Sequence, residues 1–319
     1  MNRRECLAFV LGATSLGLSK PTPFIPIIDT HIHLFDPRRP QGVPWPPKDD
    51  KILYRPALPD RYRKVTAGLG IVGAIELECS PWFEDNQWVL EIAAQDPIIV
   101  GMVGDLDPLQ ADFRKHLERL HRNALFLGIR YGNLWGRSLN EGVSKPEVIS
   151  NLKLLADAGL VMDTANPDPQ LLAGVVRLTD RIPSLRIIID HLPQLEPPRE
   201  MSARTALQAS LKELGKRPQV YVKVSEVIHP VAGQVRYDLG FYRSRLDEIW
   251  DTFGPDRLIY GSDWPNSDHS APFREELKVV REYIRGKGTD AAEKLFWKNS
   301  IAAYHWIKRS ADQPSTDVS

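Results

Sequence analysis

Two histidines one residue apart mark the stretch IIDTHIHLFDP, which runs from Ile27 to Pro37. We expect a β-strand here because isoleucine and threonine dominate the stretch, and alternate side chains of a strand point to the same side. Asp29, His31 and His33 should therefore share one face. Two imidazoles on one face can hold a metal ion or polarise a substrate oxygen, although such a pair also occurs as two hydrogen-bonded polar side chains.

Further side chains that can do chemistry lie near the ends of other apolar runs. His191 closes LRIIIDH, and Asp263 closes RLIYGSD. The charged residues in corresponding places are Glu76, Glu78, Arg130, Asp163 and Lys223. Structural alternatives exist, since an aspartate can cap a helix and buried charges can form ion pairs. The pairs considered are Arg130 with Glu78 and Lys223 with Asp29. The recurrence of such residues at strand ends favours a functional site.

Eight short, β-branched runs must position these side chains, and amphipathic helical stretches separate them. The runs are 27–33, 72–79, 98–104, 125–131, 159–165, 185–191, 220–226 and 257–263. Strands that alternate with helices pair in parallel, which predicts an α/β fold, a (β/α)8 TIM barrel. A doubly wound open sheet is the alternative, but no glycine fingerprint follows the first run. An extra C-terminal helix is expected over about 290–308.

The loop after the first run is rich in proline. Seven prolines lie between Asp36 and Pro59, so this segment cannot form a regular helix. In a barrel, such a loop lies at the face where active sites form. Four tryptophans fall in loops after predicted strands, namely Trp45, Trp82, Trp135 and Trp264. At the mouth of a barrel their indoles would stack on a ring-shaped substrate, or else they pack the loops together.

The two ends of the chain differ in composition from the middle. Residues 1–20 combine Arg3 and Arg4 with an uncharged run that is too short to cross a bilayer. This pattern resembles a twin-arginine export signal and predicts a periplasmic protein, the alternative being an N-terminal extension of a cytoplasmic one. Residues 21–309 should form a single barrel domain, and the polar segment 310–319 should be disordered.

Composition limits the expected partners. Lys and Arg together number 41, as do Asp and Glu, so the chain lacks the basic excess that nucleic-acid binding requires. Its two cysteines, Cys6 and Cys79, cannot form a disulfide framework or a CxxC zinc site. No run reaches the length of a membrane span. A small molecule is therefore the expected partner, and self-association into a homo-oligomer stays open.

Three motifs, DTHIHLFDP, IDHLP and LIYGSDWP, resemble those of the amidohydrolase superfamily, in particular its branch of sugar-lactone and pyrone-dicarboxylate lactonases. The resemblance runs from about residue 27 to residue 304 and implies a barrel hydrolase, or sometimes a decarboxylase, with an optional divalent metal. It matches the metal or catalytic positions of the family to His31, His33, His191 and Asp263. The chain has Arg130 and Asp163 where members with two metals have a modified lysine and a histidine, so we expect at most one metal ion.

The reaction that we expect is hydrolysis of a lactone, either sugar-derived or a carboxylated ring ester. Asp263 would activate water as general base, while His31, His33 and His191 polarise the carbonyl. The residues that would bind one Zn²⁺ or Mn²⁺ are His31, His33, His191 and Asp263, although the resemblance includes metal-independent members. The expected substrate-binding residues are Arg130, Glu78, Lys223, Trp45, Trp82, Trp135 and Trp264.

Two other functions stay open at this point. A metal-dependent decarboxylase of an aromatic or unsaturated carboxylic acid would use the same histidines and aspartate, with Arg130 on the departing carboxylate. A non-catalytic protein that binds a small molecule would keep the pocket without turnover. Substitution of Asp263 separates the last function from the first two, because only an enzyme would lose turnover.

Overall fold

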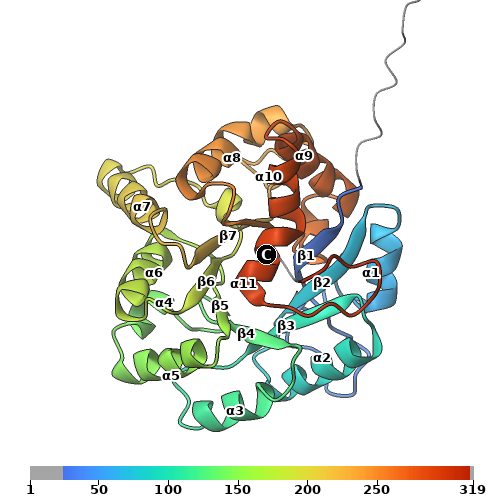
Figure 1. Ribbon diagram of the computed structural model, residues 1–319, viewed down its shortest axis with the longest axis vertical. Coiled ribbons are helices and arrows are strands. Elements are labelled where there is room, and N and C mark those ends of the chain that lie inside the picture. The colour runs from blue at the N-terminus through green and yellow to red at the C-terminus, as the bar shows by residue number, and fades with distance from the viewer. Residues whose placement is uncertain (1–23, 317–319) are drawn as a thin grey trace, which may run out of the picture.

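The computed structural model describes residues 24–316, and its eight strands fall within the predicted runs or one residue outside them. The strands are β1 (Ile27–Ile32), β2 (Ile71–Leu77), β3 (Ile99–Asp105), β4 (Phe126–Arg130), β5 (Val161–Asp163), β6 (Arg186–Ile189), β7 (Val220–Val224) and β8 (Leu258–Tyr260). Every strand pairs in parallel with the next one in sequence. β1 also meets the segment after β8, because the amide of His33 donates to the carbonyl of Trp264 over 2.8 Å. The predicted (β/α)8 barrel is confirmed (Figure 1).

Helices connect the strands and surround the barrel (Figure 1). They are α1 (Pro59–Thr66), α2 (Phe83–Gln95), α3 (Phe113–Leu120), α4 (Leu139–Gly142), α5 (Pro146–Asp157), α6 (Pro169–Arg181), α7 (Met201–Leu214), α8 (Leu239–Phe253) and α9 (Phe273–Arg285). Short 3₁₀ turns, η1 (Leu192–Gln194) and η2 (Asn266–His269), follow β6 and β8. Several helices begin with proline at the first turn, where a missing N–H costs no hydrogen bond.

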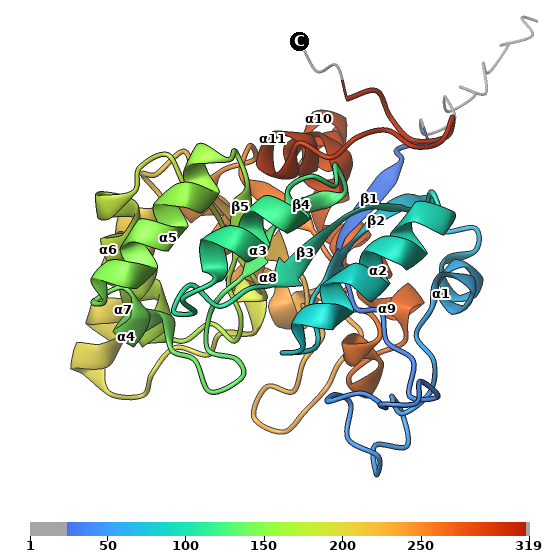
Figure 2. The ribbon, with the colours of Figure 1, turned by 90° about the horizontal axis from the view of Figure 1, so that it is seen from below.

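The C-terminal segment covers the end of the barrel at which the strands begin (Figure 2). It consists of α10 (Thr289–Glu293), the π-helical turn η3 (Lys294–Lys298) and α11 (Asn299–Tyr304). The side-chain amide of Asn299 donates to the carbonyl of Leu258 over 2.8 Å, and Arg186 donates to the carbonyl of Ala303 over 2.9 Å. The expected helix therefore exists, but it ends at Tyr304, because the next residue has a left-handed φ of 55°.

The predicted disorder of residues 310–319 is wrong for the part that the structure describes. Gln313 is 2% exposed, and its side-chain amide donates to the carbonyls of Val72, over 3.0 Å, and Pro97, over 2.9 Å. These hydrogen bonds hold the segment to the barrel base up to residue 316. Polar composition suggested disorder, but a polar side chain can be buried when backbone carbonyls satisfy it.

Two apolar clusters form the core. The larger one lies between strands and helices and includes the valines of β7 at 220, 222 and 224. The smaller one joins strand residues such as Ile28, Ile188 and Ile259 to Ile301 and Trp306 of the C-terminal segment. The interior of the barrel is therefore a packed core, as side chains fill barrels of eight strands.

A register shift in β1 changes the predicted alternation of its side chains. Asp29 does not share the face of the two histidines, because its carboxylate accepts from the hydroxyl of Tyr62 on α1 over 2.7 Å. Ile28 points into the barrel, where it joins the smaller apolar cluster. The shift lies between Asp29 and Ile32, where strict alternation no longer holds.

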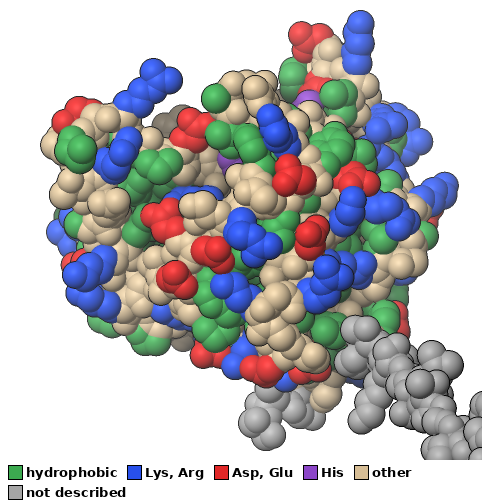
Figure 3. Space-filling view, turned by 90° about the horizontal axis from the view of Figure 1, so that it is seen from above, with side chains coloured by type: hydrophobic (Ala, Val, Ile, Leu, Met, Phe, Trp, Pro, Cys, Tyr) green, Lys and Arg blue, Asp and Glu red, His purple; other side chains and the backbone are tan. Residues whose placement is uncertain are grey.

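The long loop from residue 36 to residue 58 extends from the opposite end of the barrel, together with the loop after β7 (Figure 2). It contains no regular helix, as its prolines predict. The predicted export signal lies outside the described residues. Among residues 24–316, no helix has both the length and the apolar character that a membrane span needs. Acidic and basic side chains are interspersed over the face that Figure 3 shows.

Candidate active site

Four residues that the sequence singles out meet at the mouth of the barrel. Oδ1 of Asp263 lies 3.1 Å from Nε2 of His31, 3.1 Å from Nε2 of His33 and 3.7 Å from Nε2 of His191. All four side chains are buried. The strand ends therefore place three imidazole nitrogens around one carboxylate oxygen.

Left-handed backbone brings several of these residues into the mouth. Seven described residues other than glycine have positive φ, and five of them line the same cavity. These five are Trp135 (φ 57°), Asn166 (φ 50°), His191 (φ 50°), Glu226 (φ 47°) and Asp263 (φ 58°). Such conformations cost about 1–3 kcal/mol each and cluster at functional sites. Three of them follow the ends of β6, β7 and β8 by two or three residues, and these strands end earlier than the sequence predicts.

The two opening histidines have different hydrogen-bond partners. Nδ1 of His33 donates to the carbonyl of Leu77 over 2.8 Å, and its Nε2 lies 3.1 Å from Oδ1 of Asp263. Nε2 of His31 is buried and makes no hydrogen bond within the described residues. Nε2 of both rings thus lies close to one carboxylate oxygen, an arrangement that a proton or a cation between the atoms stabilises.

The donor set fits a divalent metal ion. Nitrogen and oxygen ligands bind such ions at about 2.0–2.2 Å, so two ligands of one ion lie about 3 Å apart. Nε2 of His31 and Nε2 of His33 each lie 3.1 Å from Oδ1 of Asp263, and the ligand atoms of two overlapping groups in the described residues lie within 4.8 Å of one another. These groups are His31 with Asp190 and His191, and His191 with Glu226 and Asp263. The carbonyl of Leu77 fixes the ring of His33 in the way that outer partners orient metal-binding histidines.

The protonation states follow from burial and charge. Burial would raise the pKa of Asp263, but contacts with His191, His31 and His33 hold it well below its ordinary value. Burial lowers the pKa of His31, and it lowers the pKa of His191 to about 3. At neutral pH the site therefore holds an ionised carboxylate with neutral His31 and His191.

Lys223, expected to contact substrate, lies instead in a charged layer below the histidines. It is fully buried, and its Nζ is 2.5 Å from Oδ2 of Asp163 and 3.0 Å from Oδ1 of Asp190. Its partner is therefore not Asp29. Nζ also lies 3.3 Å from Nδ1 of His31. Lys223 therefore lies beneath the histidines and supports them. A buried ammonium needs carboxylate partners, which Asp163 and Asp190 provide in the barrel interior.

Arg130 reaches the cavity but is already paired. Its Nε donates to Oδ2 of Asp190 over 3.2 Å and to the carbonyl of Thr164 over 3.1 Å. The proposed ion pair with the side chain of Glu78 does not form, since Arg130 contacts only the backbone carbonyl of that residue, at 3.4 Å. Glu78 instead accepts from the indole of Trp135 over 3.0 Å. The guanidinium is thus partly neutralised before any substrate binds.

The mouth opens into a cavity of about 360 Å³. Its lining consists of His33, Trp45, Cys79, Arg130, Leu134, Trp135, Asn166, His191, Gln194, Glu226, Asp263 and Asn266. Trp45 and Trp135 are among the four expected tryptophans, whereas Trp82 is absent from the lining. Trp264 is fully buried beside Tyr62 on the helix side, so its expected substrate contact is wrong.

Glu226 is the residue of the lining that the sequence reasoning missed. It ends the run VYVKVSE, and strict alternation places it on the face opposite to Lys223 and Ser225. Its left-handed φ turns the carboxylate toward Asp263 and Asn266 instead. The available signal was its place at a strand end, where the other site residues lie.

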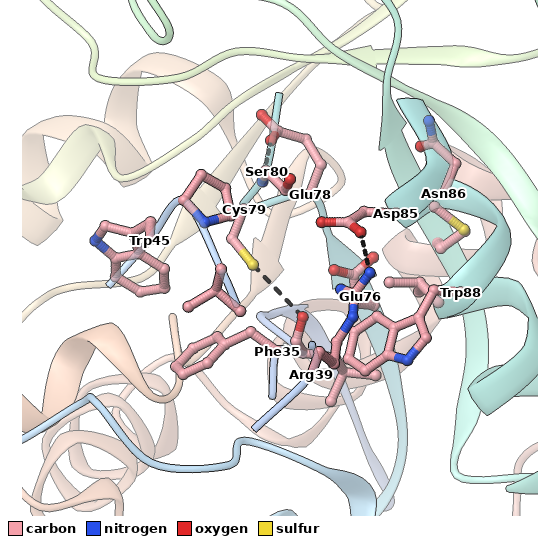
Figure 4. Close-up of a pocket in the computed structure, with 15 residues that line it drawn as sticks. Phe35, Arg39, Trp45, Glu76, Glu78, Cys79, Ser80, Asp85, Asn86 and Trp88 are labelled. Atoms are coloured by element: carbon pink, nitrogen blue, oxygen red, sulfur yellow. Dashed lines mark hydrogen bonds and ion pairs between the residues drawn. The ribbon is translucent and has the colours of Figure 1, made fainter. Parts of the chain in front are cut away.

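A smaller hollow adjoins the cavity between β2, α2 and the loop after β1 (Figure 4). Glu76 lies in it with both carboxylate oxygens free of hydrogen bonds to described residues, and burial together with Glu78 raises its pKa well above its ordinary value. Arg39 pairs with Asp85 at 2.5 Å on the other side. Glu76 therefore lies in the hollow beside α2 and is absent from the lining of the larger cavity.

Comparison with known proteins places this geometry among related barrels. The amidohydrolase family model matches residues 28–306. An L-fucono-1,5-lactonase of Burkholderia ambifaria is 27% identical over 295 residues, which are 90% of this chain and 98% of the relative. A zinc-bound amidohydrolase structure from Burkholderia multivorans has a TM-score of 0.77 at 22% identity, covering 88% of this chain and 100% of its own. A probable 2-pyrone-4,6-dicarboxylic acid hydrolase from Acinetobacter baumannii has a TM-score of 0.69 at 18% identity, covering 88% and 100%. At these identities, the two structures establish a shared fold.

Proposed function

Because this chain belongs to the amidohydrolase family, we propose that it is a hydrolase that opens the ring of a lactone by adding water. The observation that carries the proposal is the ionised carboxylate of Asp263 with three imidazole nitrogens within 3.7 Å, at the edge of a cavity. The similarity to an L-fucono-1,5-lactonase over nearly the full length of both chains supports the choice of a lactone.

Asp263 is the proposed general base. Its low pKa keeps it ionised at neutral pH, so it can accept a proton from a water molecule bound beside it. The oxygen of that water then attacks the ester carbonyl carbon. Asn266 donates to Oδ2 of Asp263 over 2.7 Å, which holds the carboxylate plane while Oδ1 faces the histidines.

The histidines would stabilise the carbonyl oxygen of the lactone, on which negative charge develops during the attack. Nε2 of His31, His33 and His191 lies within 3.7 Å of Oδ1 of Asp263, so a carbonyl oxygen bound beside this carboxylate would lie close to the three imidazoles. A divalent metal, for which zinc is our first choice, would be held by His31, His33 and Asp263 and would supply Lewis acidity. The ring C–O bond then breaks, the ring oxygen takes up a proton, and an open-chain hydroxy acid leaves.

A decarboxylase remains the second function of the same fold, but no contact favours it. Its expected carboxylate clamp, Arg130, is engaged by Asp190.

We also propose that residues 1–20 direct export to the periplasm, which detection of the intact N-terminus on cytosolic protein would contradict. Homo-oligomer formation is a further proposal, and sedimentation of the purified chain tests it.

The decisive experiment combines elemental analysis with turnover. We expect about one equivalent of divalent metal in the purified protein and hydrolysis of L-fucono-1,5-lactone that chelation abolishes and added zinc restores. Hydrolysis by metal-free protein would make the histidines direct polarisers of the carbonyl. Absence of hydrolysis across a panel of aldonolactones, with metal bound, would contradict the proposed function.

A further inference from the structure

Glu226 lines the cavity in a strained backbone conformation, and contacts of the neighbouring loop residues hold it there. It follows β7 with φ at 47°, which a glutamate adopts only under constraint. The next two amides, of Val227 and Ile228, donate to the buried carboxylate of Glu276 over 2.7 and 2.9 Å. The ring of His229 bonds to the carbonyl of Glu226 over 3.0 Å. The loop is thus fixed so that this side chain faces the cavity.

The carboxylate of Glu226 has unused hydrogen-bonding capacity. Nδ2 of Asn266 donates to its Oε1 over 3.1 Å, and the carboxyl group also interacts with that of Asp263. Oε2 is 3.7 Å from Nδ1 of His191, which is too long for a hydrogen bond, and that nitrogen already pairs with Ser225 at 2.9 Å. A carboxylate can accept about four hydrogen bonds, so most of this capacity is directed at whatever occupies the cavity.

Asp263 differs from Glu226 in this respect. Three imidazoles and Asn266 surround Asp263, whereas Glu226 is 17% exposed and lines the cavity beside amide groups of Asn266, Asn166 and Gln194. One amide nitrogen, Nδ2 of Asn266, bridges the two carboxyl groups. The two carboxyl groups are therefore neighbours, but only that of Asp263 is surrounded by the imidazoles, whereas that of Glu226 borders the open cavity.

We propose that Glu226 is a specificity residue that hydrogen-bonds a ring hydroxyl of the substrate, and so selects polyhydroxylated lactones over carboxylated rings. This inference rests on the proposed lactone hydrolysis. A hydroxyl is a donor that this carboxyl group can bind, whereas a substrate carboxylate would meet a second acidic group there.

The test compares two lactones that differ in their hydroxyls. We would measure kcat/KM for L-fucono-1,5-lactone and for unsubstituted δ-valerolactone with the wild type, Glu226→Ala and Glu226→Gln. Sites built to bind a hydroxyl discriminate strongly against substrates that lack it. We expect the preference for the hydroxylated ring to fall at least tenfold in Glu226→Ala and less in Glu226→Gln, which keeps an acceptor oxygen. The matched control is Glu196→Gln at an exposed position, which should keep the wild-type preference.

Each other outcome has a defined meaning. Equal losses for both lactones, an unchanged preference, or loss of bound metal from Glu226→Ala would overturn the assignment of Glu226. If the wild type hydrolyses no lactone, the proposed function fails, and binding of the pyranose L-fucose, measured by NMR titration, decides on Glu226 alone. At least tenfold weaker binding by Glu226→Ala would then support the assignment, whereas equal binding, or no binding to the wild type, would overturn it.

Discussion

The two ends of the barrel consist of the same strands, but the mouth buries charged and polar side chains whereas the base buries apolar ones. At the mouth, an ionised carboxylate and three imidazoles are buried together, and five residues hold left-handed backbone. At the base, Ile28, Ile301 and Trp306 form an apolar cluster, and polar side chains such as Asn299 satisfy backbone carbonyls. The mouth stores strain and unbalanced charge, whereas the base buries apolar surface that offsets them.

A charged layer separates the two ends and contacts both. Lys223 lies between Asp163 and Asp190, within 3.3 Å of His31 above. From below, the hydroxyl of Tyr304 donates to Asp163 over 2.7 Å. Burial raises the pKa of Asp163 to about 6, although Lys223 opposes this shift. The comparison predicts that substitutions at the mouth reduce activity, while those at the base reduce stability.

The largest effect should follow substitution at the mouth. Asp263→Asn keeps the size of the side chain but removes the base, so we expect kcat for lactone hydrolysis to fall about 10²–10⁴-fold. The variant should still unfold cooperatively in denaturant, with near-normal circular dichroism. Asp251→Asn, at an exposed position of α8, is the control and should keep wild-type kcat. Normal turnover by Asp263→Asn would reject this base.

Substitution at the base should have the converse effect. Trp306 is 1% exposed, and its indole donates to Ser300 over 2.9 Å. Trp306→Ala should lower the free energy of unfolding by about 3–5 kcal/mol while kcat at 25 °C stays near wild type. Chemical denaturation measures the first quantity, and the neighbouring exposed Ile307→Ala should change it by less than about 0.5 kcal/mol. Equal free energies of unfolding for Trp306→Ala and Ile307→Ala would contradict the proposed contribution of the base to stability.

The smallest expected effect is a pH dependence of stability that comes from Glu276, whose carboxyl group binds the loop after β7. Burial raises the pKa of Glu276 from 4.5 to about 7, although the amides of Ile228 and Val227 lower it. The folded state therefore binds this proton more tightly than the unfolded state, so the contribution is full below about pH 4.5 and is lost as pH rises through 7. Between pH 5 and 8, the wild type should lose about 1–3 kcal/mol relative to Glu276→Gln. Exposed Glu282→Gln on the same helix should show no such trend, and a wild type that gains stability relative to Glu276→Gln as pH rises would contradict the sign.

Much of the fold could be predicted because strand and helix patterns are local. The eight strands, the proline-rich loop and the convergence of His31, His33, His191 and Asp263 all follow from periodicity and strand ends. Prediction failed where backbone departs from regular alternation. A register shift redirected Asp29, and a left-handed residue redirected Glu226.

The sequence by itself determined the barrel, the order of its elements and the chemistry that its mouth offers, because apolar periodicity and residue type are properties of the chain. Only the tertiary structure decided which charged groups face each other. Lys223 pairs with Asp163 and Asp190 instead of Asp29, and Trp264 is buried on the helix side. Those outcomes depend on contacts between strands far apart in sequence, where desolvation makes each buried charge take the partner that the closed barrel places beside it.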